Sequence, residues 1–392
     1  MSNQKLGILA VVAAVMVLWA AVQSRLSSRG GARVSGPSYL IQGLDPADIN
    51  SITVGYGDDA VQIKRQGGRF VVANEAGYPA DPKQINDLIT KSLDVKTTEV
   101  YTDKPENHEE LEVTEEKARH VVKFFKEDGS LLTGVVVGKS QEAGQSTFVR
   151  QAGDDTVWLS ESSPYFRSRG LDYVNQEIVS VKREDVNAVT VTTPDGAYTL
   201  RPKEGGDGVI FEGLPDGKKL KESDAKSVFG ALTSLRFDDV NRPGEIEGVS
   251  FDHLYVCRLD DSTEYKLNLG KKGDKTYLIC EAKYTDTTPV TKKLNEVETE
   301  EQLKAKEARL LADEKAQKFT LRHKGWVYQV PEWKAKYLTQ KREDLLEDVE
   351  EETPAEEPAP AEVTPAGPAV EPNAVTVPAA PPAEPNVVDP NA

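Results

Sequence analysis

The chain has 392 residues, which is enough for two or three domains of ordinary size. Its formal net charge is −17, but thirteen of the acidic residues lie between Glu343 and the C-terminus, where there is no Lys or Arg. The remainder is close to neutral and lacks a basic patch of the kind that binds nucleic-acid phosphates. These properties exclude nucleic acid as a partner and indicate a globular chain with an acidic C-terminal segment.

The N-terminal segment is strongly apolar. Residues 6–22 form an uncharged run of seventeen residues, at the lower limit of length for a helix that crosses a bilayer. The run is longer than the apolar part of most cleaved signal peptides, and no A-x-A cleavage site follows it. We therefore predict a cytoplasmic stub and a transmembrane anchor in residues 1–30. A cleaved signal peptide and a buried helix of a soluble protein are the alternatives.

The flanking charges give conflicting indications of how this anchor is oriented. Lys5 precedes the apolar run, whereas Arg25, Arg29 and Arg33 follow it. Taken alone, the positive-inside rule places the side that is richer in Lys and Arg in the cytoplasm. That orientation is the opposite of the N-in arrangement usual for short N-terminal anchors.

The central part of the chain repeats itself. Residues 48–54, DINSITV, correspond to residues 185–191, DVNAVTV, and a turn, two further strand patterns and a helical segment follow in both places. Later, residues 120–139 correspond to residues 253–272, and both stretches predict a strand hairpin that ends in Gly-Lys. The sequence therefore predicts two copies of one structural unit.

Each copy contains one amphipathic helical segment, at 81–95 and at 222–237. The residues expected on the buried faces are Ile85, Leu88, Ile89 and Ser92 in the first copy and Ala225, Val228, Phe229 and Leu232 in the second. We predict an α+β fold made of two tandem repeats, at 45–180 and 181–345. Each repeat is expected to be an antiparallel sheet covered on one face by its helix.

Residues 134–140, GVVVGKS, are similar to a phosphate-binding P-loop, G-x-x-x-x-G-K-[ST], but one residue is missing between the glycines. A working P-loop opens a helix, whereas these residues end the second strand of a predicted hairpin. The corresponding residues 265–273, YKLNLGKKG, have neither the first glycine nor a Ser or Thr after the lysine. We predict no nucleotide site here, and a turn in which Gly138 has a positive φ angle.

The two cysteines, Cys257 and Cys280, lie on predicted strands with one strand between them. In a simple meander that separation is roughly 10 Å, whereas a disulfide needs Cα atoms within about 7 Å. We therefore predict two free, half-buried thiols.

No combination of residues in the sequence has the spacing of a catalytic, cofactor-binding or metal-binding site. Four histidines lie far apart, and we predict structural roles for them: His108, His120, His253 and His323. Trp158 and Trp326 occupy similar positions in the two copies, and we expect both in the core, with sugar stacking as the alternative. We accordingly predict no cofactor, no metal and no enzymatic activity.

Two charged segments complete the chain. Residues 299–318 predict an inserted surface helix with a capping box between Thr299 and Gln302. Leu303, Leu310 and Leu311 would form its weak packing face, and a coiled-coil partner is the alternative. Residues 346–392, rich in Pro, Ala and Glu, predict a disordered tail, with a spacer or a docking segment as the alternative.

These features together resemble a bacterial family catalogued as domain of unknown function 4340. The resemblance depends on the apolar N-terminus, the DINSITV strand, Pro79-Ala80-Asp81 before a helix, and the strand that ends in Gly138-Lys139. It extends over about 45–345, although the second copy has Leu220-Lys221 in place of Pro-Ala-Asp. Members of the family are often associated with ABC transporter components of the gliding-motility type, and no catalytic residue is known to us for them.

The resemblance implies an accessory or scaffolding protein of an ABC-type membrane complex, with a permease or ATPase as partner. It also implies an inner (cytoplasmic) membrane location, anchored by residues 6–22, with the bulk of the chain periplasmic or otherwise extracytoplasmic. A cell-envelope module that binds glycan or peptide is the alternative, and a hydrolase is a third reading.

Overall fold

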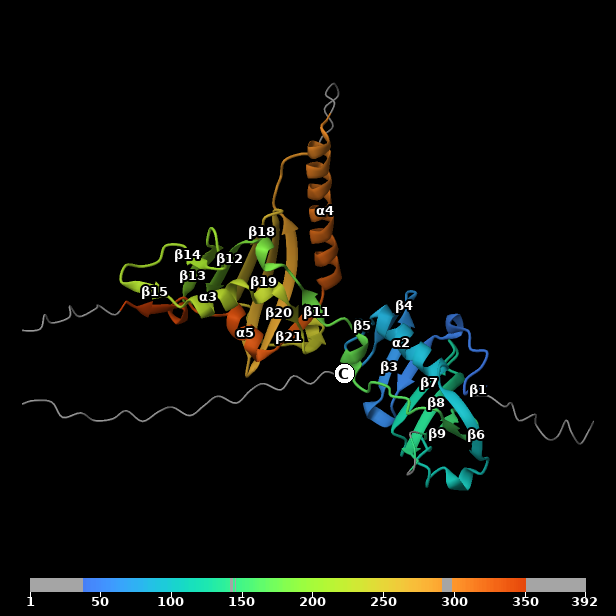
Figure 1. Ribbon diagram of the computed structural model, residues 1–392. Helices are drawn as coiled ribbons and strands as arrows, with labels where there is room; N and C mark the ends of the chain where they lie inside the picture. The colour runs from blue at the N-terminus through green and yellow to red at the C-terminus, as the bar shows by residue number, and fades with distance from the viewer. Residues whose placement is uncertain (1–37, 142–143, 145, 291–297, 350–392) are drawn as a thin grey trace, which may run out of the picture. The chain divides into compact units, whose positions relative to one another are not determined.

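The computed structural model describes residues 38–141, 144, 146–290 and 298–349. The predicted anchor at 6–22 lies outside these residues, as does almost all of the predicted tail. Among the helices of the described residues, none combines the length and the apolar character that crossing a bilayer requires. Residues 38–348 belong to one compact unit, and their fold is α+β, as predicted (Figure 1).

Within the described residues, the first sheet has ten strands in the order β1-β6-β10-β9-β8-β7-β2-β3-β4-β5, and the paired strands are antiparallel. The strands are β1 (Ser38–Tyr39), β2 (Ser51–Val54), β3 (Val61–Gln66), β4 (Arg69–Val72), β5 (Tyr78–Pro79), β6 (Lys96–Thr102), β7 (His120–Phe125), β8 (Leu131–Ser140), β9 (Thr147–Gln151) and β10 (Val157–Ser160).

The second large sheet has eight strands in the order β14-β13-β12-β18-β19-β20-β21-β17, again within the described residues. Its strands are β12 (Val186–Thr193), β13 (Gly196–Pro202), β14 (Val209–Phe211), β17 (Asp239–Asn241), β18 (His253–Leu259), β19 (Thr263–Lys272), β20 (Lys275–Tyr284) and β21 (Val327–Val330). Two small ladders pair β11 (Glu177–Val179) with β16 (Leu235–Arg236), and β15 (Lys218–Leu220) with β22 (Leu346–Asp348). Residues 346–348 are therefore a paired strand, and the prediction that the tail starts at 346 is wrong by a few residues.

The two large sheets have the same strand order. If β6, β10, β9, β8, β7, β2, β3 and β4 are matched with β17, β21, β20, β19, β18, β12, β13 and β14, every neighbour in one sheet has its counterpart in the other. The registers also agree. In the first sheet, four pairs of cross-strand partners are Val54–Val122, His120–Val137, Val137–Val149 and Trp158–Val100. In the second sheet, the pairs that correspond to them, in the same order, are Val191–Tyr255, His253–Leu269, Leu269–Leu278 and Tyr328–Val240. The counterpart of Trp158 is thus Tyr328, so the positions of Trp158 and Trp326 are similar but differ by two residues.

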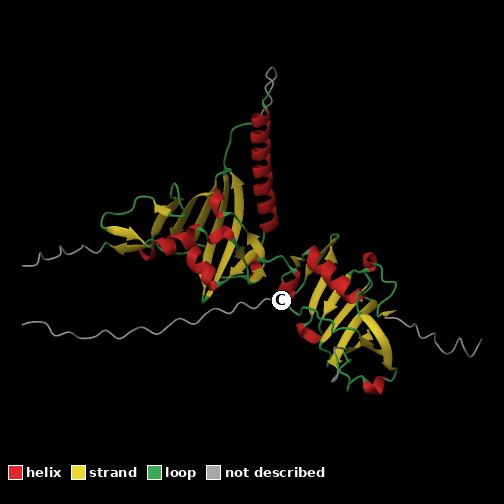
Figure 2. Ribbon diagram, in the orientation of Figure 1, coloured by secondary structure: helices red, strands yellow, loops and turns green. Residues whose placement is uncertain are grey.

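Two short helices cover the sheets. The apolar residues of each helix recur on one side of it, and that side packs against the sheet. Helix α2 (Pro82–Leu93) buries the four residues predicted for its inner face. Helix α3 (Glu222–Phe229) buries Ala225, Val228 and Phe229, and Leu232 is buried in the 3-10 turn that follows. The hydroxyl of Tyr255, on β18, donates to the carbonyl oxygen of Val228 at 2.8 Å, which fixes α3 against its sheet. Figure 2 shows these helices lying against strands.

Helix α4 (Glu300–His323) is longer than the predicted 299–318 and begins with the predicted capping box. Its buried residues are Ala312, Ala316 and His323, so the prediction that its leucines form the packing face is wrong. The helix lies along β20, which pairs with β21 only at Thr276–Leu278. Beyond that point α4 covers the edge of the strand that β21 leaves open (Figure 1).

Candidate functional site

The P-loop-like stretch lies inside strand β8 and not in a turn. Gly138 does not have a positive φ angle, so that prediction is wrong. A Cβ atom at Gly138 would overlap the carbonyl oxygen of Leu111 and approach Cγ1 of Val113 to 2.7 Å. Glycine is present because a crossing loop approaches the strand closely. Among the described residues, the element that follows β8 is strand β9 and not a helix that could bind phosphate.

The second sheet contains the same close approach. Gly270, on β19, lies one residue beyond the partner of His253, as Gly138 lies one residue beyond the partner of His120. A Cβ atom at Gly270 would overlap the carbonyl oxygen of Ser250. The shared Gly-Lys is therefore a packing feature of both sheets.

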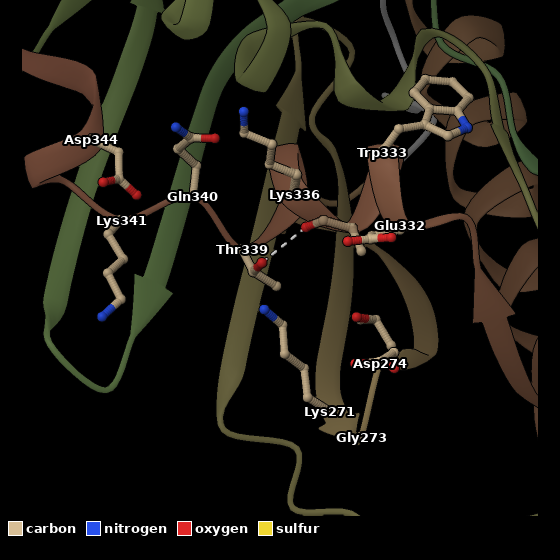
Figure 3. Close-up of a pocket in the computed structure, with 12 residues that line it drawn as sticks. Lys271, Gly273, Asp274, Glu332, Trp333, Lys336, Thr339, Gln340, Lys341 and Asp344 are labelled. Carbon is tan, nitrogen blue, oxygen red and sulfur yellow. Dashed lines mark hydrogen bonds between the residues drawn. The ribbon is translucent and has the colours of Figure 1, made fainter.

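An open cleft of about 590 Å³ lies beside helix α5 (Glu332–Leu338). The end of β19 supplies Lys271, the turn that follows it supplies Asp274, and α5 supplies Glu332 and Lys336. Figure 3 shows Lys271 and Asp274 on the same side as Glu332, whereas the ring of Trp333 points away from them. The cleft therefore combines cationic and anionic groups in similar number.

The loop after α5 completes this cleft with Thr339, Gln340, Lys341 and Asp344. Thr339 donates to the carbonyl oxygen of Ala335 at 2.9 Å, and Lys341 pairs with Asp195 at 2.7 Å. That hydrogen bond and the charge of Asp195 raise the pKa of Lys341. The side-chain oxygen of Gln340 is buried and has no hydrogen-bond partner in the described part of the chain. The cleft therefore offers a polar ligand both hydrogen-bond donors and acceptors.

The second candidate site is the outer side of α4, which carries four exposed leucines. We call Leu303, Leu310, Leu311 and Leu321 the leucine face; they are 52%, 56%, 57% and 73% exposed. With Val290, three of them line a shallow groove of about 570 Å³, and its charged lining residues are Glu298, Lys306, Glu307 and Glu314. Leu321 was missed in the sequence because the predicted helix ended at 318, although its spacing from Leu310 places it on the same side of a helix.

The histidines have structural surroundings and do not meet in the cleft. Nε2 of His108 lies 2.8 Å from the carbonyl oxygen of Asp155, and Nδ1 of His253 lies 2.6 Å from the Asp252 carboxylate. The ring of His120 packs edge-on against Tyr165. Nδ1 of His323 is 2.7 Å from the Tyr328 hydroxyl, and burial lowers the pKa of His323 to about 4.

Both cysteines are free, as predicted, but they are buried and not half-buried. Cys257 pairs with Tyr265 across β18 and β19, and Cys280 pairs with Leu267 across β19 and β20. One strand therefore separates the two thiols. Burial raises the pKa of each to about 12, so neither is a ready nucleophile or metal ligand.

Comparison with known families gives one match. The model of the family described as domain of unknown function (DUF4340) matches residues 71–253, from β4 to the first residue of β18. This match confirms the resemblance predicted from the sequence, and the matched stretch is shorter than the expected 45–345. The comparisons with curated proteins and with solved structures found no match.

Proposed function

We propose that the chain is a non-enzymatic, membrane-anchored accessory or scaffolding protein of an ABC-type membrane complex. Residues 6–22 would anchor it in the inner membrane, with the rest of the chain outside the cytoplasm. The family supplies the expectation of an ABC-type partner. The observation that carries the proposal is the leucine face of α4, because exposed leucines that recur along one side of a long helix are typical of a protein-binding element.

The proposed architecture behind this function is a tandem repeat. The common strand order, the common registers and the equivalent close-approach glycines support two modules descended from one unit. The charged helix occurs in the second module, between β20 and β21, where the first has only a short connection between β9 and β10. The second module would therefore have the specialised binding role.

Co-purification from cells that make the full chain tests this function. The chain would carry a C-terminal tag, be crosslinked lightly in living cells and be purified from solubilised native membranes, with an unrelated tagged single-pass protein as control. We expect mass spectrometry to show enrichment of a permease and an ATPase over the control. Recovery of the chain alone would contradict the proposal.

The orientation can be tested separately. A protease that does not cross membranes would be added to intact spheroplasts of cells that make the tagged chain. We expect digestion of the domain, because the proposal places it outside the cytoplasm. Protection until the cells are lysed would show instead that Arg25, Arg29 and Arg33 hold the domain on the cytoplasmic side.

A second candidate function is binding of a cell-envelope glycan or peptide in the cleft beside α5. The observation that favours it is the group of donors and acceptors around Lys271, Asp274 and Gln340, with Trp333 exposed next to them. Titration of the chain with soluble cell-wall fragments tests it. Saturable binding that Lys271→Ala weakens would support this function, and the absence of binding would contradict it.

A further inference from the structure

The leucine face lies on the side of α4 that is turned away from the sheet. At 100° per residue, Leu303, Leu310 and Leu321 fall within about 20° of one another, and Leu311 is about 80° away. The residues that α4 buries, Ala312, Ala316 and His323, lie about 180–220° from this line. The strip is therefore separate from the surface that holds α4 on its own domain.

The positions along this strip follow a heptad pattern. Successive residues on it are spaced four, three, four, three and four apart, which is the spacing of helix–helix contact positions: Leu303, Glu307, Leu310, Glu314, Gln317 and Leu321. The whole strip is exposed. Its length of about five turns is sufficient for one partner helix to lie along it.

Two of the six contact positions are glutamates. Glu314 pairs with Lys318 of its own helix at 2.5 Å, with both side chains largely exposed. Such a pair contributes only about 0.3–0.5 kcal/mol and is readily exchanged for another partner. Glu307 lies near the middle of the strip and forms no ion pair with another described residue.

These glutamates argue against a second copy of the chain as the occupant. In a parallel pair each glutamate would face its own counterpart, and in an antiparallel pair Glu314 would face Leu310. Either arrangement would remove four carboxylates from water, and of the two glutamates only Glu314 has a described cation, Lys318, beside it to offset that loss, so burial is unfavourable. Charge complementarity instead requires cations opposite Glu307 and Glu314, seven residues apart on the partner.

We propose that the leucine face of α4 binds an amphipathic helix of a partner protein that carries Lys or Arg seven residues apart within its apolar strip. The leucines would supply the buried area, and the two glutamates would set the register and select against helices with acidic contact positions. This inference rests on the proposed function, because it identifies the surface through which a scaffolding protein would hold its partner.

Two synthetic helical peptides test this surface against the full chain in detergent. Both have Leu at alternate contact positions, and the other contact positions are Lys in the first peptide and Glu in the matched control. We expect the Lys peptide to bind at least about tenfold more tightly by fluorescence anisotropy, since one well-placed charge pair corresponds to a factor of this order. The Glu307→Lys/Glu314→Lys variant should reverse the preference, whereas Glu301→Lys, on the other side of α4, should not.

Equal binding of the two peptides, or no binding, would overturn the inference. Self-association of the wild-type chain by sedimentation that the glutamate substitutions leave intact would overturn it as well, because a second copy would then cover the face. The Leu303→Gln/Leu310→Gln variant replaces exposed residues and keeps good helix formers, so it should fold normally.

The co-purification experiment separates this inference from the proposed function. If the wild-type chain retains a permease and an ATPase and the double-Gln variant loses them, both proposals are supported. If both chains retain them, the leucine face is not the docking surface although the function stands. If the wild-type chain retains neither, the proposed function fails, and the peptide titration still decides whether the face selects basic helices.

Discussion

The side-chain hydroxyl of Thr320 makes two hydrogen bonds with the backbone of Ala282. It accepts from the amide nitrogen and donates to the carbonyl oxygen, each at 2.8 Å. Ala282 lies on the part of β20 beyond its pairing with β21. Thr320 therefore takes the place of a neighbouring strand at this edge and fixes α4 against it.

We expect Thr320→Val, which has nearly the same shape, to lower the free energy of unfolding by about 1–3 kcal/mol, because it leaves a backbone amide and carbonyl of β20 unpaired. Thr320→Ser retains the hydroxyl and is the matched control, with a loss of less than about 1 kcal/mol. Urea unfolding followed by tryptophan fluorescence measures both. Equal stability of the Val variant and the wild type would show that water satisfies these groups.

The close-approach glycines give a second prediction. Gly138→Ala and Gly270→Ala should each destabilise the chain by about 1–3 kcal/mol or more, because the new Cβ would overlap a backbone carbonyl oxygen that cannot move freely. Gly206→Ala is the control, since a Cβ there meets nothing within 4 Å and its φ angle is not positive. If all three variants unfold at the same denaturant concentration, the loops move aside more easily than this packing implies.

Much of the fold follows from local patterns in the sequence. The hairpins, the meander around the cysteines and the inner faces of α2 and α3 were predicted because alternating or helical spacing directly reports a buried face. The reason for Gly138 could not be predicted, since the crossing loop that approaches it is more than twenty residues away in sequence.

The outer surface of α4 shows the other limit of sequence reasoning. Apolar spacing predicted that the leucines pack inward, but which side of a helix packs depends on what it meets. Here the helix meets an open strand edge, and small residues and Thr320 suit that contact better than leucines do. The cleft beside α5 has no local pattern at all, because a hairpin turn and a helix about sixty residues apart in sequence form it.

Helix capping differs between α2 and α3, and this gives a third prediction. The Asp81 side chain accepts a hydrogen bond from the amide of Lys83 at 2.9 Å, whereas Lys221 at the same position of α3 makes no such bond. Asp81→Ala should lower stability by about 0.5–2 kcal/mol. Lys221→Asp should raise stability by adding such a cap. It also removes the hydrogen bond that Lys221 donates to the carbonyl oxygen of Asp344, which offsets part of the gain. If both variants are less stable than the wild type, the lost hydrogen bond between Lys221 and Asp344 outweighs the added cap.

The buried thiols give a fourth prediction. Burial raises the pKa of Cys257 and Cys280 to about 12, so almost no thiolate exists at neutral pH. The native chain should therefore react with a thiol reagent only through unfolding, and both groups should react quickly in denaturant. Rapid modification of one thiol in the native chain, measured by mass spectrometry, would show that its strand opens locally.

The last prediction concerns the pH dependence of stability. His323 is buried against Phe319 and Tyr328, and burial, aided by the charge of Arg322, lowers its pKa from the usual 6.5 to about 4. Between these two values the unfolded chain binds a proton that the folded chain does not. The contribution of a neutral His323 is therefore complete above about pH 6.5 and is lost progressively as the pH falls to about 4, by about 3 kcal/mol.

Urea unfolding at half-unit pH steps should show this loss in the wild type. His323→Gln, which cannot take up a proton, should start from lower stability because its bond to Tyr328 changes, and should have a flatter profile in this window. Parallel profiles for the two chains would mean that carboxylates, and not His323, set the acid sensitivity.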